Sequence, residues 1–200
     1  MMNVAIVDTG VANISSVKFA LERLSINPLI TNNTDLIKKS DRVILPGVGS
    51  APHAMRRLKS EGIDTVLKVL KQPVMGICLG MQILYEYLEE GGSSIEGLGL
   101  LKGKVKLLNT KQNPSPHMGW NKLNFSKKDC LLNGVKNGSY VYFVHSYAAD
   151  LSNFTLAKTN YGNDFSSIVK KNNIYGCQFH PERSSSVGAN ILKNFLELKT

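Results

Sequence analysis

The chain has 200 residues, of which 42% are hydrophobic, and it carries a formal net charge of +9. This length is typical of one globular domain with its own core, and no apolar segment is as long as a membrane-spanning helix. The Lys and Arg residues are scattered without interleaved aromatic side chains, and the three Cys residues lack zinc-site spacing. Composition therefore argues against a membrane protein, a nucleic-acid interface, a zinc site and a disulfide framework, and it favours a reducing cytoplasm.

The first part of the chain alternates between short apolar runs and helical patterns. Residues 3–8 and 41–47 are apolar runs that end in Asp, Pro or Gly, as buried strands do. The first run has no basic leader before it, so we expect a strand rather than a signal peptide. Apolar residues recur at helical spacing over 14–24 and again over 63–70. This strand–helix–strand order is typical of a parallel sheet flanked by helices.

A cysteine between two glycines follows in the segment 74–88, with an apolar run before it and a helical pattern after it. The sequence Gly76-Ile77-Cys78-Leu79-Gly80 fits the strand–turn–helix elbow, in which small residues allow a nucleophile to sit at a cramped bend. A helix that begins at Leu79 would favour the thiolate of Cys78, and the Leu79 N–H would be a natural oxyanion donor. The alternative is a small apolar core residue, which is the commoner role of cysteine.

The remainder of the chain predicts antiparallel strands and a final helix. Residues 97–158 contain short β-like runs and no convincing helical pattern. The segment 166–180 is typical of a hairpin with its turn at 171–173, and apolar spacing predicts a helix over 187–198. We therefore predict an α/β fold for residues 1–200 as a single domain. Its mainly parallel central sheet is flanked by helices, with antiparallel strands in the middle third.

A partner for the cysteine occurs near the end of the chain, where His180 and Glu182 flank Pro181. Proline disfavours a helical conformation for the residue before it, so we expect His180 in an extended segment. Residues two apart in such a segment project to the same side. A carboxylate beside an imidazole can orient the ring and stabilise its protonated form. The sequence therefore predicts a triad of Cys78, His180 and Glu182.

Other chemically interesting side chains are predicted to be structural. His53 is expected at the surface, and Asp8 is expected to make a local hydrogen bond at the end of the first strand. Cys130 and Cys177 lack flanking glycines and are expected to pack in the interior.

The order of GICLGMQ and QFHPE resembles that of the class I (triad) glutamine amidotransferases, and the resemblance extends along essentially the whole chain. The motifs LPGVGS, PHMGWN, YFVHSY and QFHPERSS are further similar to the glutaminase subunits of imidazole glycerol phosphate synthase. The glutaminase domains of anthranilate and GMP synthases typically carry PGGP or PGPG at the first of these motifs and lack PHMGW.

This resemblance implies an enzyme of histidine biosynthesis that hydrolyses glutamine to glutamate and ammonia. Ammonia would pass through a channel to a (β/α)₈ barrel cyclase, the second subunit of a heterodimer. The cyclase makes imidazole glycerol phosphate and an aminoimidazole carboxamide ribotide. Cys78 would be the nucleophile, His180 the acid and base, and Glu182 its orienting partner. The resemblance implies neither a metal nor an organic cofactor.

The same resemblance implies which residues bind substrate and partner. Those that bind glutamine or its oxyanion would be Val48, Gly49, Leu79, Gln82, His145, Ser146 and Tyr147. Those at the cyclase interface would be Asn13, Met118, Trp120 and Arg183. His117 and His145 would be positioning groups rather than bases. Trp120 could instead anchor the core.

Three alternative functions remain open at this point. A paralogous glutaminase that feeds a cyclase-like partner in surface-sugar amidation would share most of these motifs. A cysteine peptidase or other hydrolase could use the same elbow, although Gln82 and Glu182 argue against it. A binding module with a basic face for RNA would not need an intact triad.

Overall fold

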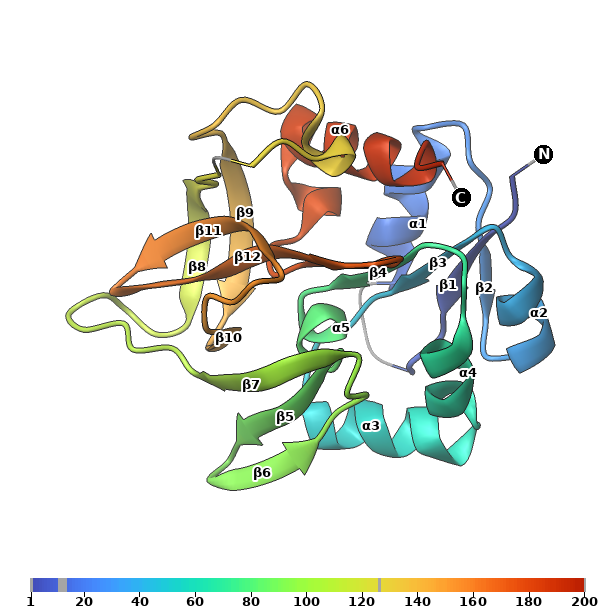
Figure 1. Cartoon of the computed structure of the whole chain (residues 1–200), viewed down its shortest axis with the longest axis horizontal. Coiled ribbons are helices and arrows are strands. Elements are labelled where there is room, and N and C mark those ends of the chain that lie inside the picture. Colours follow the sequence, from blue (N-terminus) through green and yellow to red (C-terminus); the bar gives the residue numbers. More distant parts are fainter. Residues whose placement is uncertain (1, 11–13, 126, 200) are drawn as a thin grey trace.

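The computed structural model describes residues 2–10, 14–125 and 127–199 of the chain. In this described part the largest sheet has seven strands, in the order β11-β12-β13-β4-β3-β1-β2 (Figure 1). Its strands are, in chain order, β1 (Val4–Val7), β2 (Leu29–Thr31), β3 (Arg42–Leu45), β4 (Val74–Ile77), β11 (Thr155–Tyr161), β12 (Asn163–Lys171) and β13 (Ile174–Cys177). Strands β2, β1, β3, β4 and β13 run parallel, whereas β12 and β11 are antiparallel. The predicted α/β fold with a mainly parallel central sheet is confirmed.

Helices cover both faces of this sheet. Helices α1 (Ile14–Glu22) and α6 (Ser185–Leu196) pack on one face, and α2 (Thr34–Lys39), α3 (Ala51–Ser60) and α4 (Ile63–Val69) pack on the other (Figure 1). The helices predicted over 14–24, 63–70 and 187–198 correspond to α1, α4 and α6. Among the helices that the structure describes, none is long and apolar enough to cross a membrane.

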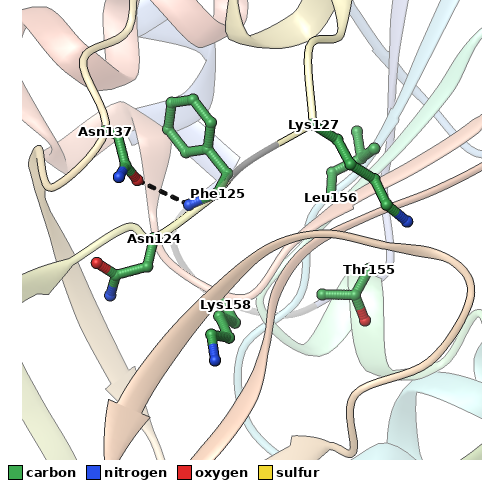
Figure 2. A pocket seen from close by; sticks show the side chains of 7 residues that line it. All are labelled: Asn124, Phe125, Lys127, Asn137, Thr155, Leu156 and Lys158. Carbon is green, nitrogen blue, oxygen red and sulfur yellow. Dashed lines mark hydrogen bonds between the residues drawn. The ribbon is translucent and has the colours of Figure 1, made fainter.

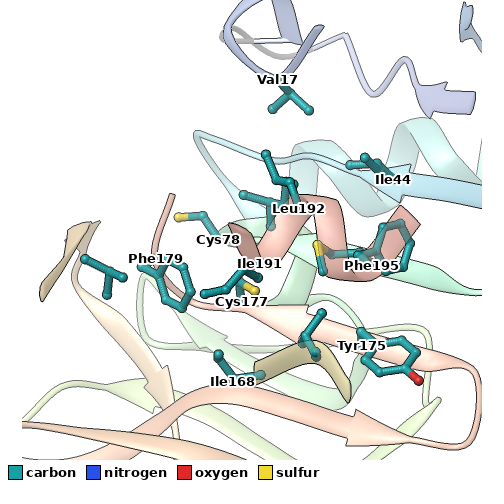
Figure 3. Packing of buried hydrophobic residues seen from close by; sticks show 14 of the residues in the cluster. Val17, Ile44, Cys78, Ile168, Tyr175, Cys177, Phe179, Ile191, Leu192 and Phe195 are labelled. Atoms are coloured by element: carbon teal, nitrogen blue, oxygen red, sulfur yellow. The ribbon is translucent and has the colours of Figure 1, made fainter. Parts of the chain in front are cut away.

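The continuous apolar runs of the strands follow from this double coverage. In β3, Ile44 packs with the cluster under α1 and α6, while Val43 and Leu45 pack with the cluster on the opposite face. A strand that is buried on both faces needs apolar residues at every position. Figure 3 shows the first cluster, in which Val17 of α1 and Phe195 of α6 lie on the same side as Ile44.

Two smaller sheets complete the fold. One has the order β10-β7-β5-β6 and the other pairs β8 with β9. Their bounds are β5 (Tyr85–Glu90), β6 (Ser93–Glu96), β7 (Leu101–Leu107), β8 (His117–Lys122), β9 (Tyr140–His145) and β10 (Tyr147–Ala149). All these pairs are antiparallel except β5 with β7, so the antiparallel strands predicted for the middle third are confirmed. The predicted hairpin is formed by β12 and β13, with Asn172 in the turn.

The helix after Cys78 is shorter than its pattern predicts. Helix α5 (Leu79–Gln82) has four residues, and β5 begins at Tyr85. The backbone N–H of Leu98 donates to the carbonyl of Ile83 at 2.8 Å, so this carbonyl is not available to a longer helix. Tyrosines in the following segment also favour a strand. The helical pattern predicted beyond the first turn is therefore wrong.

The functional motifs meet at one edge of the central sheet. Strands β3, β4 and β13 are neighbours and parallel, so their carboxyl ends lie side by side. The segments that leave these ends carry Val48, Cys78 and His180. This edge is where open α/β sheets bind their ligands.

Candidate active site

Cys78 occupies a strained turn between β4 and α5. Its φ of 54° and ψ of −112° lie in a region that few non-glycine residues adopt. A Cβ atom on Gly80 would collide with the carbonyl oxygen of Leu45, and one on Gly76 would lie 2.5 Å from the carbonyl oxygen of Gly80. Backbone packs directly on backbone here, which is the reason that the sequence predicts for the two glycines.

His180 and Glu182 form a buried pair. The distance from His180 Nδ1 to Glu182 Oε1 is 2.7 Å, and the side chains are 3% and 0% exposed. His180 has extended backbone and its N–H donates to the carbonyl of Tyr142. Glu182, however, lies in the 3₁₀ turn η2 (Pro181–Arg183), not in an extended segment. The predicted contact is present, but a tight turn produces it rather than strand alternation.

The electrostatics of this pair favour a charged imidazole. Burial lowers the pKa of His180, but the nearby Cys78 and Glu182 outweigh burial and raise this pKa to about 10. The ring is therefore protonated near neutral pH. Within the described residues, His180 Nε2 makes no hydrogen bond of good geometry, and it lines the same cavity as Cys78. An imidazolium beside a sulfur can donate a proton to a leaving group.

A cavity of about 290 Å³ contains all the predicted substrate-binding residues. It is lined by Val48, Gly49, Cys78, Leu79, Gln82, Glu90, Val144, His145, Ser146, Tyr147 and His180. Two of these, Glu90 and Val144, were missed by sequence reasoning. Glu90 lies at the end of β5 in a run with other glutamates, so composition does not distinguish it. Its Oε2 accepts the backbone N–H of Ala51, the first residue of α3, at 2.7 Å.

The predicted oxyanion region holds a carbonyl rather than two donors. The N–H of Leu79 donates to the carbonyl oxygen of Gly47 at 3.3 Å. Since a trans peptide directs its C=O and N–H to opposite sides, the N–H of Val48 points away from Leu79. One predicted donor is thus occupied and the other is turned away. The residues are where the sequence predicts them, but the peptide before Val48 does not present its donor.

Two glutamine side chains connect the cavity wall to the sulfur. Gln82 Nε2 donates to the carbonyl of Tyr147 at 2.8 Å and to Gln178 Oε1 at 3.0 Å. Gln178 Nε2 in turn lies 3.9 Å from Cys78 Sγ, within the range of a hydrogen bond to sulfur. Gln178 was missed by sequence reasoning. Its signal was its place two residues before His180 in the same strand end.

The residues predicted at a partner interface are on the surface where they are described. Met118 and Trp120 are 59% and 53% exposed on the same face of β8, and Arg183 is exposed on η2. The alternative of Trp120 as a core anchor is therefore wrong. Asn13 lies outside the described residues.

The residues expected to have structural roles lie where the sequence predicts them, with one exception. His53 is exposed and Cys177 is fully buried, as predicted, and Asp8 Oδ1 accepts the N–H of Gly10 at 2.9 Å. Cys130 is exposed, so its predicted packing role is wrong. It starts the short turn η1 (Cys130–Leu132), where Leu131 and Leu132 are buried in its place.

A second cavity of about 320 Å³ lies elsewhere in the fold (Figure 2). It is lined by Asn124, Phe125, Lys127, Asn137, Thr155, Leu156 and Lys158. No Cys, His or carboxylate is among these described lining residues, and none of the predicted functional residues is there. The first cavity is therefore the candidate active site.

The chain matches the class-I glutamine amidotransferase family over residues 5–198. It belongs to this family. The subunit HisH 1 of imidazole glycerol phosphate synthase from Vibrio vulnificus (strain YJ016) is 46% identical, with 98% of each chain covered. The corresponding HisH subunit from Haemophilus influenzae is 47% identical at the same coverage. The resemblance predicted from the motifs is thereby confirmed, and an unrelated peptidase is disfavoured.

Solved structures agree on the amidotransferase fold. A putative GMP synthase protein from Thermoplasma acidophilum superposes with a TM-score of 0.73, and the match covers 98% of this chain and 92% of that protein. At 20% sequence identity this likeness bears on the fold alone. In this chain the described cavity lies at the carboxyl edge of the central sheet.

Proposed function

We propose that the chain is the glutaminase subunit of an imidazole glycerol phosphate synthase and that Cys78, His180 and Glu182 are its catalytic triad. The observation that carries this proposal is their convergence. The strained cysteine and His180 border one cavity with every predicted substrate residue, and buried Glu182 holds His180 from behind. The HisH relatives support the assignment of the synthase over the surface-sugar paralogue.

Acylation begins when the Cys78 thiolate attacks the carboxamide carbon of glutamine. A C–S bond forms, negative charge develops on the carboxamide oxygen, and the C–N bond then breaks. Protonated His180 donates its proton to the departing nitrogen, which leaves as ammonia. Glu182 holds the ring through Nδ1, so the proton is carried on the nitrogen that borders the cavity.

Deacylation uses the same residues in the reverse sense. His180, now neutral, takes a proton from a water molecule that attacks the glutamyl thioester. The C–S bond breaks, glutamate leaves, and the thiolate and imidazolium are restored. The chemistry needs no redox step and no group beyond water, Cys78 and His180.

The cavity also supports recognition of an amino acid. Glutamine carries an α-ammonium group, and Glu90 has the only carboxylate among the described residues that line the cavity. Its hydrogen bond from the Ala51 N–H holds one carboxylate oxygen in place. We assign Glu90 to the α-ammonium group and Gln82 to the wall beside the side chain of the substrate.

The partner is expected on the outer face of β8 and β9. Met118 and Trp120 lie on this face opposite Val144 and Tyr142 of β9. Exposed Trp and Met are typical of interface centres. Val144 also lines the active-site cavity, so this hairpin connects the two surfaces. A cyclase barrel bound here would receive the ammonia, in a cytoplasmic heterodimer.

The proposal is tested by reconstitution with the cyclase subunit. Glutamate release is measured for the chain alone, for the complex, and for the complex with the ribonucleotide ligand of the cyclase. We expect glutamine hydrolysis that depends on the cyclase and product formation coupled to it. A complex that forms but releases no glutamate would contradict the function, and failure to bind the cyclase would contradict the partner.

A further inference from the structure

Two buried histidines lie at one end of the hairpin formed by β8 and β9, beside the active-site cavity. His117 begins β8 and His145 ends β9, and they are directly opposite in the register of the hairpin. Both are nearly inaccessible to solvent. His145 lines the cavity, whereas His117 does not. The reaction proposed above uses neither ring as an acid or base.

Asn121 determines which nitrogen of His117 carries the proton. Its Oδ1 accepts the backbone N–H of Lys122 at 2.8 Å, and its Nδ2 donates to the carbonyl of Asn160 at 3.0 Å. These partners fix the orientation of the amide. Nδ2 also lies 3.2 Å from His117 Nε2, so this ring nitrogen accepts a hydrogen bond and has no proton.

The proton of His117 is therefore on Nδ1, which donates to His145 Nε2 at 2.9 Å. His145 must then carry its proton on Nδ1, which is 2.8 Å from the carbonyl oxygen of Tyr147. The other end of this series of hydrogen bonds leads to the same assignment, because the Tyr147 carbonyl can only accept a hydrogen bond. Burial lowers the pKa of His117 to about 4 and that of His145 to about 3, which keeps both rings neutral.

The ring of His117 is also held in its plane. It stacks between Phe143, at a centroid distance of 4.7 Å, and Tyr161, at 3.9 Å. The hydroxyl of Tyr161 donates to the carbonyl of Pro114 at 2.8 Å, which fixes the second stacking partner. The donor on His117 Nδ1 is thus directed at His145 with little freedom to turn.

This series of hydrogen bonds ends at Tyr147, which is part of the cavity wall. The Tyr147 carbonyl accepts both His145 Nδ1–H and Gln82 Nε2–H, each at 2.8 Å. We infer that His117 is a positioning residue for glutamine binding: it holds His145 by the hydrogen bond to Nε2, and through His145 it fixes the Tyr147 carbonyl and the Gln82 amide. This inference rests on the proposed function.

A matched pair of variants separates the donor from the ring. Asn and Leu have similar shapes, and the Nδ2 of Asn lies near the position of the histidine Nδ1. His117→Asn therefore retains a donor toward His145, whereas His117→Leu removes it, and both lose the stacking and the bond from Asn121. We expect His117→Leu to raise the KM for glutamine about 3- to 10-fold over His117→Asn, with a smaller effect on kcat, as for one buried hydrogen bond.

Stability and nitrogen NMR provide independent readouts. At this buried position the Leu variant is expected to have a higher melting temperature than the Asn variant. If the KM only followed stability, the Asn variant would therefore have the higher KM, which is the opposite of our prediction.

Nitrogen NMR should find His145 as the Nδ1–H tautomer in all three proteins, because the Tyr147 carbonyl can only accept. The resonance of His145 Nε2 should show an accepted hydrogen bond in the wild type and His117→Asn, and should shift to that of a nitrogen without this bond in His117→Leu. If both substitutions at His117 prevent folding, Asn121→Leu removes the donor to His117 Nε2 and should change the KM and the His145 Nε2 resonance in the same direction.

All kinetics are measured in the complex with the cyclase. Equal KM values for the Leu and Asn variants, or an unchanged His145 Nε2 resonance in His117→Leu, would overturn the positioning role. A wild-type complex without glutaminase activity would instead contradict the proposed function, and the NMR comparison would still test the hydrogen bond from His117 to His145.

Discussion

On one side of the active-site cavity, the Cys78 elbow and the His180–Glu182 pair are fixed by buried contacts within the chain. On the other side, the carbonyl of Gly47 occupies the N–H of Leu79, which a developing oxyanion would need. The proposed nucleophile is thus positioned by the fold, whereas the stabilisation of the oxyanion that we propose depends on the orientation of one peptide. The difference indicates that folding alone prepares the covalent chemistry, and that a separate event, which we assign to cyclase docking, completes the site.

The largest expected effect comes from removing the nucleophile. Cys78→Ala should reduce glutamine-dependent synthesis about 10⁶-fold, to background, because no neighbouring group can form the thioester. Synthesis from an ammonium salt should be nearly unchanged, since the cyclisation belongs to the partner. Product formation is measured with each nitrogen source.

Cys130→Ala is the matched control, because Cys130 is exposed and outside the cavity. It should leave both activities intact. Retained glutamine-dependent activity in Cys78→Ala would show that Cys78 is not the nucleophile, and loss of both activities would show that it is structural.

The oxyanion side predicts a strong dependence on the partner. The isolated chain should hydrolyse glutamine at least about 10²–10³-fold more slowly than the complex, because the loss of a single oxyanion donor has this cost and neither Leu79 nor Val48 presents its N–H until the peptide before Val48 turns. Single-chain and complex rates are compared at saturating glutamine. Equal rates would mean that the orientation in this structure does not limit catalysis.

A smaller effect is expected at the surface that transmits docking. Trp120→Ala should weaken cyclase binding by about 2 kcal/mol, or about 30-fold in Kd, while the melting temperature changes little. Titration calorimetry and thermal melting distinguish affinity from stability. Tyr87→Ala, an exposed aromatic on β5, is the control and should not affect binding. A large fall in melting temperature with unchanged affinity would argue against an interface role for Trp120.

The smallest expected effect is on the pH dependence of activity, through His180 and Glu182. Glu182 raises the pKa of His180, which is about 10, so Glu182→Gln should lower it. The protonated ring would then be lost at lower pH, and the basic limb of kcat/KM should move toward neutral pH. The profile is measured from neutral pH to about pH 10 in the complex. A basic limb in the same position would indicate that His180 is not the group that titrates.

Much of the cavity side that carries Cys78, His180 and Glu182 could be predicted from the sequence, because its local structure requires particular residue types. Glycines two positions before and after Cys78 are required where backbone meets backbone, and Pro181 separates a histidine from a carboxylate. The α/β order was also predictable, since strands buried on both faces are continuous apolar runs. The short elements β2 and α2 were not, because three and six residues are too few to establish a period.

The peptide orientation on the oxyanion side of the cavity could not be predicted from the sequence pattern. Glycine before Val48 permits either orientation of the peptide, so no residue type indicates where the carbonyl points. Glu90 resembles neighbouring surface glutamates until the fold of β5 brings it to α3. The end of α5 was missed because the carbonyl groups of Ile83 and Leu84, which follow it, accept hydrogen bonds from a segment more than ten residues away.

The hydrogen bond between Leu79 and Gly47 has a consequence for the nitrogen supply of a cell. Glutamine is a shared donor, and a free glutaminase would release its amide nitrogen where no acceptor is ready. With a carbonyl in the oxyanion position, we expect chains made in excess of the cyclase to hydrolyse little glutamine. The two subunits can then be produced in unequal amounts without draining the glutamine pool.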